Sequence, residues 1–414
     1  MKKLYTSIDI GSDSIKILVA EMHNNKLNVL AQTDTRSKGM KKGLIVDANE
    51  VLISLKESFH NIEGKLGTKI EKVIANIPPY FMEFETVTGY TTVTNEENRV
   101  TGNDIIRTLQ ASVYNKVHEN KELVSLSPIE FILDEKKQLT DPNGLVGKKL
   151  DVKARMVITY KKNVQSILSI LQMIGIEVVD INIGPIADYN EFRTKELDKA
   201  TTAIINIGAE LTTISVFNKG IIEKAQSIQV GGKNIDNDIA YVFKLDEKNS
   251  KKIKETFSVA HKKFAQVNEV YEMLNINRDL LNITQYDLSQ VVMSRAVEIL
   301  EIAKKQTYLL TNKEIQYIII TGGITELPGI NYLINDIFGS CAKIGEIDTI
   351  GIRNNKFSTV SGLIKTFDKK QKLKNRAYST FGIDKEEELS LPKKRINISN
   401  DSVLGKVFGY FFDS

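Results

Sequence analysis

Alternating apolar and polar residues predict two or three β-strands over residues 4–31. The apolar positions flank a short turn at Gly11, so the first two strands are expected to form a β-hairpin. The same pattern returns over residues 205–214, around Gly208. Because an internal repeat is a strong sign of duplicated architecture, the sequence predicts two equivalent lobes.

Between the two hairpins the periodicity changes several times. Asp47 is expected to cap a helix over residues 49–66. Residues 84–160 have a different, strand-rich character and predict a small α+β insert. The other elements expected here are strands at 73–77, 85–93, 123–133, 152–158 and 177–183 and helices at 104–116 and 163–174.

The second half is expected to be richer in helices. Strands are predicted within 220–230, and a helix is expected to begin at Gly231. Amphipathic patterns follow at 251–264 and 289–310. A buried strand at 317–320 then runs into Gly322 and Gly323, with a further helix opening after Gly329.

The end of the chain departs from this pattern. Residues 368–402 are charged and lack periodicity, which is typical of a flexible linker. In the last residues the apolar side chains fall within an arc of about 140° on a helix, with Lys406 opposite. These apolar residues are Leu404, Val407, Phe408, Phe411 and Phe412. We expect an amphipathic helix that lies on an anionic membrane, and the alternative is a helix that docks on its own domain.

Length, net charge and cysteine content limit the kinds of fold and partner that the sequence allows. With 414 residues and 42% hydrophobic content, the chain is expected to fold into more than one lobe. The net charge of +4 gives no reason to expect nucleic acid as a partner. One cysteine, Cys341, excludes a disulfide framework and is expected to be a small buried residue in a reducing cytosol.

The glycine turns carry the candidate chemistry. Backbone N–H groups and hydroxyls in two facing hairpins can hold a polyphosphate and its metal from both sides. A strand that ends at Gly322 and Gly323 lets a flat base and its ribose lie against bare backbone. Each signal by itself also fits an ordinary turn, but their order along the chain favours a nucleotide site.

That order resembles the actin, heat-shock-chaperone and sugar-kinase superfamily, and nearly the whole chain resembles the bacterial FtsA cell-division family. Residues 39–47 and 230–240 are similar to characteristic FtsA segments. Residues 128–134 and 141–150 are similar to the subdomain that FtsA has in place of an actin subdomain. The linker and amphipathic C-terminus complete the resemblance.

The resemblance implies an α/β, two-lobed actin-like ATPase fold with a small α+β insert in the first lobe and a C-terminal amphipathic helix. The implied domains are a first lobe core (1–83, 163–198 and 341–367), the insert (84–162), a second lobe core (199–233 and 313–340), a helical subdomain (234–312), a linker (368–400) and a membrane-targeting helix (401–414).

The resemblance also implies residue roles for ATP and Mg²⁺. Asp9 is expected to hold Mg²⁺ through water. The other expected cofactor-binding residues are Gly11, Ser12, Ser14, Lys16, Asn206, Gly208, Thr212, Gly231, Gly232, Lys254, Glu255, Gly322 and Gly323. On spacing alone, Lys254 and Glu255 also fit a solvated helix face.

Four positions depart from the superfamily or FtsA pattern, and a fifth, Pro185, bears on hydrolysis. Asn206 stands where an aspartate is usual, and Ala209 and Glu210 replace a commoner glycine-rich turn. Asp236 stands where FtsA chains usually have threonine. Pro185 falls near the expected position of a residue that would orient the attacking water. We therefore expect ATP binding with weak or absent hydrolysis, and no catalytic residue is assigned.

The implied function is an ATP-binding adaptor that polymerises on the cytoplasmic face of the cell membrane at the division site. Its expected partners are the FtsZ C-terminal tail, further copies of itself, the anionic membrane surface and other division proteins. Arg295 matches a family arginine near the FtsZ contact, and an ion pair with Glu298 is the alternative reading. Two alternative functions are an FtsA-like pilus-assembly adaptor and a small-molecule kinase of the same superfamily.

Overall fold

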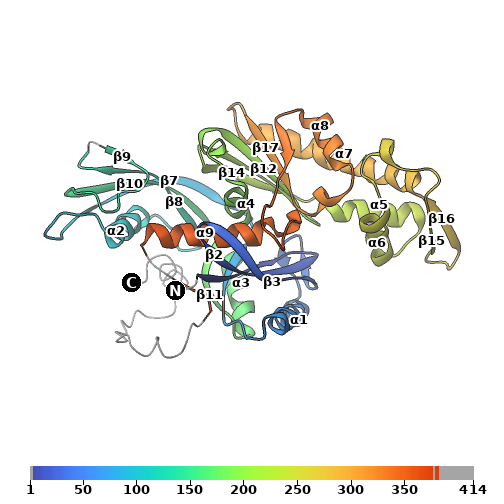
Figure 1. Ribbon diagram of the computed structural model, residues 1–414, viewed down its shortest axis with the longest axis horizontal. Coiled ribbons are helices and arrows are strands. Elements are labelled where there is room, and N and C mark those ends of the chain that lie inside the picture. The colour runs from blue at the N-terminus through green and yellow to red at the C-terminus, as the bar shows by residue number, and fades with distance from the viewer. Residues whose placement is uncertain (1–2, 136, 376–377, 382–414) are drawn as a thin grey trace.

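The computed structural model describes residues 3–135, 137–375 and 378–381 and contains two lobes (Figure 1). Each lobe is built on one mixed sheet. The first-lobe sheet has the strand order β11-β6-β1-β2-β3, and the second-lobe sheet has the order β14-β13-β12-β17-β18. When the second order is reversed, β1, β2 and β3 correspond to β12, β13 and β14, and β6 and β11 correspond to β17 and β18. The two orders are therefore equivalent, and the predicted duplication is present in the fold.

The first-lobe strands are β1 (Leu4–Ile10), β2 (Ser14–His23), β3 (Lys26–Arg36), β6 (Lys72–Ile77) and β11 (Glu177–Ile183). The short strands β4 (Met40–Lys41) and β5 (Leu44–Ile45) pair with each other beside this sheet. Helices α1 (Ala48–Leu66) and α3 (Lys161–Met173) contact each other and the sheet. As predicted, Asp47 caps α1, because its carboxylate accepts hydrogen bonds from the backbone N–H groups of Asn49 and Glu50.

The second-lobe strands are β12 (Thr201–Ile207), β13 (Thr212–Asn218), β14 (Ile221–Ile228), β17 (Tyr317–Thr321) and β18 (Ala342–Ile344). Helix α8 (Ile330–Phe338) packs beside β18. A helical subdomain extends from this lobe in Figure 1. It contains α5 (Gly232–Phe243), α6 (Glu247–Phe257), α7 (Gln285–Leu310) and a hairpin of β15 (Val270–Leu274) and β16 (Leu280–Thr284).

The insert lies at the opposite end of the molecule (Figure 1). Its sheet has the order β7-β10-β8-β9 and carries one packed helix, α2 (Gly102–Val113). The strands are β7 (Glu83–Thr92), β8 (Lys121–Leu133), β9 (Lys137–Leu139) and β10 (Lys149–Tyr160). This arrangement agrees with the predicted α+β insert.

Two crossing helices join the lobes. Helix α4 (Gly184–Phe192) packs against α9 (Ser358–Leu373) and also contacts β12 and β13 of the second lobe. A Cβ atom at Gly362 would lie 1.9 Å from the backbone oxygen of Ala187, so the helices touch through bare backbone. On the other side of α4, the ring of Tyr189 stacks on Phe217 at 4.2 Å.

Several features differ from the sequence-based expectations, among them Cys341, which is partly exposed rather than buried. Helix α4 was not predicted, because it is short and nearly all of its residues are buried, polar ones included, so no apolar stripe of helical period marks it. The β15–β16 hairpin was also missed, because its strands are short and largely exposed. The predicted linker boundary at residue 368 falls inside α9, which ends at Leu373.

Residues beyond that boundary also pack on the first lobe. Asp368 is buried and accepts a hydrogen bond of 3.3 Å from the Tyr5 hydroxyl. Thr380 accepts a hydrogen bond of 2.7 Å from the backbone N–H of Thr6. The predicted amphipathic helix, residues 401–414, lies outside the described residues.

Candidate functional site

The two repeated hairpins close in the same way. In the first, the backbone N–H of Gly11 donates to the backbone oxygen of Ser14 at 3.1 Å. In the second, Gly208 donates to Leu211 at 2.9 Å. The sequence repeat thus corresponds to one backbone motif, present once in each lobe.

The glycine signals that are far apart in the sequence meet beside the second hairpin. A Cβ atom at Gly231 would lie 2.5 Å from the backbone oxygen of Gly208. One at Gly322, whose φ is +97°, would lie 2.3 Å from that of Ile207. Gly323 is exposed and has nothing within 4 Å of its Cβ position. Backbone therefore approaches backbone closely here, while space is left beside Gly323 for a ligand.

Polar groups around Asp9 fit a hydrated divalent cation. The Asp9 carboxylate accepts a hydrogen bond of 2.7 Å from Asn76 Nδ2. Asn76 Oδ1 is buried and has no hydrogen-bond partner among the described residues. Water bound to a cation donates hydrogen bonds, and a carboxylate oxygen is a ligand that Mg²⁺ prefers. Nearby on β2, Lys16 Nζ donates to Ser14 Oγ at 2.9 Å.

Asn206 occupies the equivalent position on β12, and its amide is held by buried groups. Asn206 Nδ2 donates to Asp188 Oδ2 on α4 at 2.7 Å, and Thr359 Oγ1 lies 3.4 Å away. Ser358 and Thr359 on α9 also donate to the Asp188 carboxylate, at 2.8 and 2.9 Å. Burial raises the pKa of Asp188 to about 6; these hydrogen bonds oppose the rise, and the charge of Asp9 adds to it.

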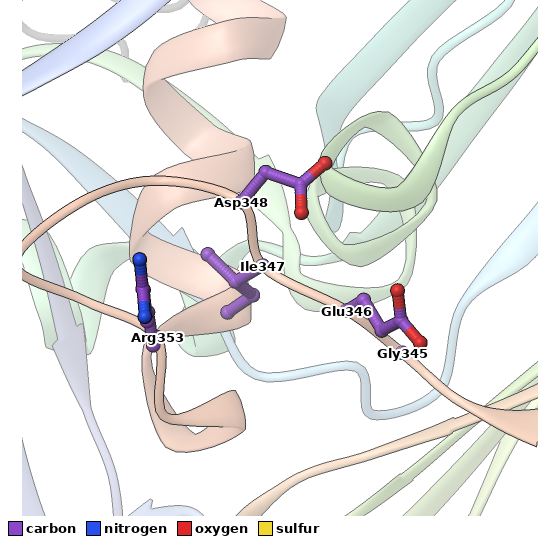
Figure 2. Close-up of a pocket in the computed structure, with 5 residues that line it drawn as sticks. All are labelled: Gly345, Glu346, Ile347, Asp348 and Arg353. Atoms are coloured by element: carbon purple, nitrogen blue, oxygen red, sulfur yellow. The ribbon is translucent and has the colours of Figure 1, made fainter.

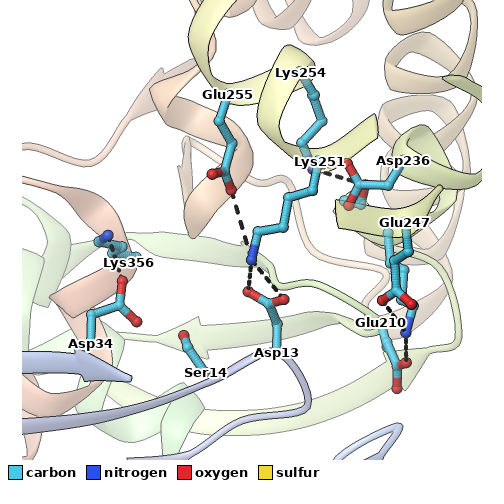
Figure 3. Close-up of polar contacts among 12 residues, drawn as sticks. Asp13, Ser14, Asp34, Glu210, Asp236, Glu247, Lys251, Lys254, Glu255 and Lys356 are labelled. Atoms are coloured by element: carbon cyan, nitrogen blue, oxygen red, sulfur yellow. Dashed lines mark hydrogen bonds and ion pairs between the residues drawn. The ribbon is translucent and has the colours of Figure 1, made fainter. Parts of the chain in front are cut away.

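An ion pair connects the two lobes across the first hairpin. Lys251 Nζ, on α6, lies 2.6 and 2.8 Å from the two carboxylate oxygens of Asp13 (Figure 3). A second connection starts in the 39–47 segment, where the backbone N–H of Lys42 donates to Glu210 at 2.5 Å. Lys42 Nζ also donates to Gln229 at 2.6 Å. The hairpin of one lobe therefore contacts the facing lobe through polar groups.

Several candidate residues are engaged in neighbouring contacts. Thr212 is buried, and its hydroxyl donates to the backbone oxygen of Val230 at 2.9 Å. Glu210 lies 3.3 Å from Lys233, which offsets the negative charge that Glu210 brings to the turn. Ser12 accepts a hydrogen bond of 2.7 Å from the backbone N–H of Gly43.

Lys254 and Asp236 form a pair at the base of the helical subdomain. Lys254 Nζ lies 2.7 Å from Asp236 and donates to the backbone oxygen of Gly232 at 3.2 Å. Burial raises the pKa of Asp236, and the charge of Lys254 opposes the rise. The Glu255 side chain is more than half exposed, beside Lys251 (Figure 3). The departure at residue 236 therefore has a charge partner that sequence reasoning did not identify.

Arg295 is already paired within the helical subdomain. Its guanidinium donates to both oxygens of Asp238, at 2.6 and 3.1 Å, and to Glu298 at 2.5 Å. The side chain remains partly exposed. The ion pair with Glu298 that the sequence left open as an alternative is therefore formed.

A separate pocket lies where β18 continues toward α9 (Figure 2). Its lining residues are Gly345, Glu346, Ile347, Asp348 and Arg353. None of the candidate nucleotide-binding residues lines it.

The predicted membrane residues Leu404, Lys406, Val407, Phe408, Phe411 and Phe412 lie outside the described residues. In the part of the chain that the structure describes, no helix combines the length and apolar character needed to cross a membrane.

Two family models match the chain. The model "Cell division protein FtsA" matches residues 203–362, and the model "SHS2 domain inserted in FTSA" matches residues 82–158. The second match coincides closely with the β7–β10 insert. An FtsA protein of Bacillus subtilis (strain 168) is 28% identical over 87% of this chain and 83% of its own length. One of Streptococcus pneumoniae is 26% identical over 87% of this chain and 79% of its own length.

Solved structures share the fold. The "PilM-PilN type IV pilus biogenesis complex" matches with a TM-score of 0.58 and 14% identity, covering 87% of this chain and 97% of that chain. MreB5 of Spiroplasma citri, solved bound to ADP, matches with a TM-score of 0.53 and 14% identity, covering 90% of this chain and 98% of that chain. These matches agree with a two-lobed actin-like fold.

Proposed function

The chain belongs to the FtsA family of bacterial cell-division proteins, within the actin-like ATPase superfamily, and we propose that it binds ATP and tethers FtsZ to the membrane. In this proposal it self-associates into filaments on the cytoplasmic face of the membrane at the division site. The observation that carries the nucleotide part is the pair of equivalent hairpins, Gly11–Ser14 and Gly208–Leu211, with bare glycine backbone at Gly322 and Gly323 beside them.

In the proposed site, groups from both lobes bind the nucleotide. Backbone N–H groups and hydroxyls at Gly11, Ser12 and Ser14, with Lys16, would bind phosphate oxygens from the first lobe. Gly208, Gly231 and Gly232 would approach from the second lobe, while Gly322 and Gly323 would back the adenosine. Mg²⁺ would neutralise phosphate charge when bound, and Asp9 would hold it through water.

We propose weak or absent hydrolysis. Asn206 carries no charge, and no residue is assigned to orient an attacking water. A kinase of the same superfamily would instead need a carboxylate base beside an acceptor site and would turn over on the order of 10 times per second. Steady-state turnover of that speed would overturn the adaptor proposal.

The proposed FtsZ contact involves Arg295. Its guanidinium is partly exposed and already binds carboxylates of Asp238 and Glu298, which supports an exchange with the acidic residues of an FtsZ tail. Arg295→Glu is expected to weaken binding of an FtsZ tail peptide without changing ATP binding. Unchanged peptide affinity would remove Arg295 from the contact.

Membrane attachment is assigned to the amphipathic segment. Its five apolar side chains, partly buried, would contribute roughly 5 kcal/mol, which corresponds to weak binding by one tail. Secure attachment therefore requires several tails on one filament. Since the fold is shared with a PilM-containing pilus complex, a pilus-assembly adaptor is the second candidate, and it would be expected to lack this tail.

Vesicle flotation separates these candidates. The full chain is expected to float with anionic vesicles, increasingly so as protein concentration rises. Phe408→Glu should abolish most flotation, because it places a charge within the apolar part of the membrane. Lys406→Ala should weaken the free energy of membrane binding by about 1 kcal/mol, and only on anionic lipid. If a chain truncated at Asn400 floats as well as the full chain, the tail is not the anchor.

A further inference from the structure

The most heavily hydrogen-bonded buried carboxylate near the candidate site belongs to Asp188, a residue that no sequence pattern singled out. It is 1% exposed and lies on α4, where that helix crosses α9 between the lobes. Three side chains donate to it: Asn206 from β12 at 2.7 Å, and Ser358 and Thr359 from α9 at 2.8 and 2.9 Å. Asp188 therefore connects both helices of the lobe junction to the second hairpin.

The contact between Asp188 and Asn206 fixes the orientation of the amide. An ionised carboxylate only accepts hydrogen bonds, so the group that Asn206 turns toward Asp188 must be its NH₂. Asn206 Oδ1 is then directed toward Gly322, whose Cβ would lie 2.8 Å from that oxygen. The acceptor atom of Asn206 is thus held on the side of the glycine backbone.

The pair also explains why residue 206 can differ from the superfamily pattern. An aspartate at residue 206 would place two carboxylates in hydrogen-bond contact in a buried setting, which repel each other. Asparagine removes the repulsion, and the negative charge is kept one side chain away at Asp188. The charge of Asp9 adds a small rise to the pKa of Asp188, after burial and the three hydrogen bonds.

We propose that Asp188 is a positioning residue of the Mg²⁺–nucleotide site: it supplies the negative charge that residue 206 lacks and orients the Asn206 oxygen toward the backbone of Gly322. This inference rests on the proposed nucleotide binding and deepens it. Groups that orient the ligands of a metal typically change metal affinity 10- to 100-fold when altered. Asp188 acts through Asn206 and through charge, without touching the nucleotide.

The test measures the affinity of a fluorescent ATP analogue as a function of free Mg²⁺. Asp188→Asn keeps the shape of the side chain and removes the charge. We expect the Mg²⁺ concentration needed for half-maximal enhancement of binding to rise about 10-fold or more. Binding in EDTA should stay within about 2-fold of wild type, because the hairpins that would bind the phosphates are untouched. Asp198→Asn is the matched control: Asp198 is also a hydrogen-bonded carboxylate, contacting Tyr189 and Arg193, but lies away from the hairpins.

An exchange of the two residues provides the decisive variant. Asn206→Asp alone is expected to lower the melting temperature of the nucleotide-free protein, because two acids meet. The double variant Asp188→Asn with Asn206→Asp should recover both the melting temperature and Mg²⁺ dependence to within a few-fold of wild type, since an amide again faces a carboxylate. A structural role for Asp188 alone would not produce recovery of the Mg²⁺ response.

Three results would overturn the inference. One is an Asp188→Asn protein with the wild-type Mg²⁺ response, and another is an equal loss of binding in EDTA and in Mg²⁺. The third is a double variant no better than the two single changes combined. A wild-type protein that binds no ATP analogue under either condition would overturn the proposed nucleotide function itself, which separates the two failures.

Discussion

At the scale of single residues, Gly323 offers a clean probe of the proposed nucleotide site. It is exposed, and nothing lies within 4 Å of its Cβ position. Gly323→Glu should therefore leave the fold intact and fill the space proposed for adenosine. We expect at least a ~100-fold loss of affinity for a fluorescent ATP analogue, since the ligand and side chain cannot share the space.

Gly64→Glu is the matched control for this substitution. Gly64 also has nothing within 4 Å of its Cβ position, and it lies on α1 in the first lobe. Equal binding by the Gly323 and Gly64 variants, each with a wild-type melting temperature, would place the nucleotide elsewhere.

The buried side chain of Glu122 is expected to make the stability of the insert depend on pH. It is 0% exposed, neither carboxylate oxygen has a hydrogen-bond partner among the described residues, and burial raises the pKa of Glu122 to about 7. A raised pKa means that the folded state favours the neutral acid. The free energy of unfolding should therefore fall as pH rises from about 4.5 to about 7 and then level off.

The corresponding variant is Glu122→Gln, which cannot ionise. At pH 8 it should be more stable than wild type by up to roughly 3 kcal/mol, because one pKa unit corresponds to about 1.4 kcal/mol. The difference should vanish near pH 4.5, and urea denaturation at both pH values measures it. Glu119→Gln, at an exposed position nearby, is the control. A difference of the same size at both pH values would contradict the assignment to ionisation.

At the scale of elements, the crossing of α4 and α9 depends on Gly362. A Cβ atom there would lie 1.9 Å from the Ala187 oxygen, so even alanine must push the helices apart. We expect Gly362→Ala to lower the free energy of unfolding by about 3 kcal/mol and to weaken nucleotide binding, because Asp188 lies next to this contact.

The neighbouring Ser361 provides the comparison. Its hydroxyl is buried without a hydrogen-bond partner among the described residues, so Ser361→Ala should be neutral or slightly stabilising. Guanidinium denaturation measures both variants. Equal unfolding midpoints for Gly362→Ala and wild type would mean that the helices do not pack this closely.

At the scale of the whole molecule, the Asp13–Lys251 ion pair connects the two lobes beside the candidate site (Figure 3). Both side chains are about a third or more exposed, so the pair contributes at most about 1 kcal/mol. Lys251→Ala should favour opening and accelerate release of a bound ATP analogue by roughly 2- to 5-fold, with little change in melting temperature. Stopped-flow release measures this rate.

Ionic strength and a neighbouring lysine test the electrostatic explanation. The difference between wild type and Lys251→Ala should shrink in about 0.5 M salt, where exposed charges are screened. Lys252→Ala changes an exposed lysine on the same helix and should release the analogue at the wild-type rate. If both variants accelerate release equally, the interlobe ion pair is not what slows the release of the analogue.

The sequence by itself determined those features that depend on neighbours along the chain. The two hairpins, the cap at Asp47 and most strands could be predicted, because side-chain alternation and turn residues act over a few positions. The candidate glycines at residues 11, 208, 231 and 322 could be named because close backbone approach requires that residue type. Their assigned ligand roles remain proposals.

Only the tertiary structure decided which distant side chains meet. Asp188 contacts Asn206, Ser358 and Thr359, and Lys251 contacts Asp13. Apart from Asp188 and Asn206, the two residues of each pair are more than a hundred positions apart in the sequence. Helix α4 was missed because the packing of the two lobes buries it on nearly all sides, its polar residues included, so no apolar stripe in its sequence indicates a helix. Local periodicity fixes where a chain turns and which face is buried, but the pairing of charges depends on how completed sheets and helices pack against each other.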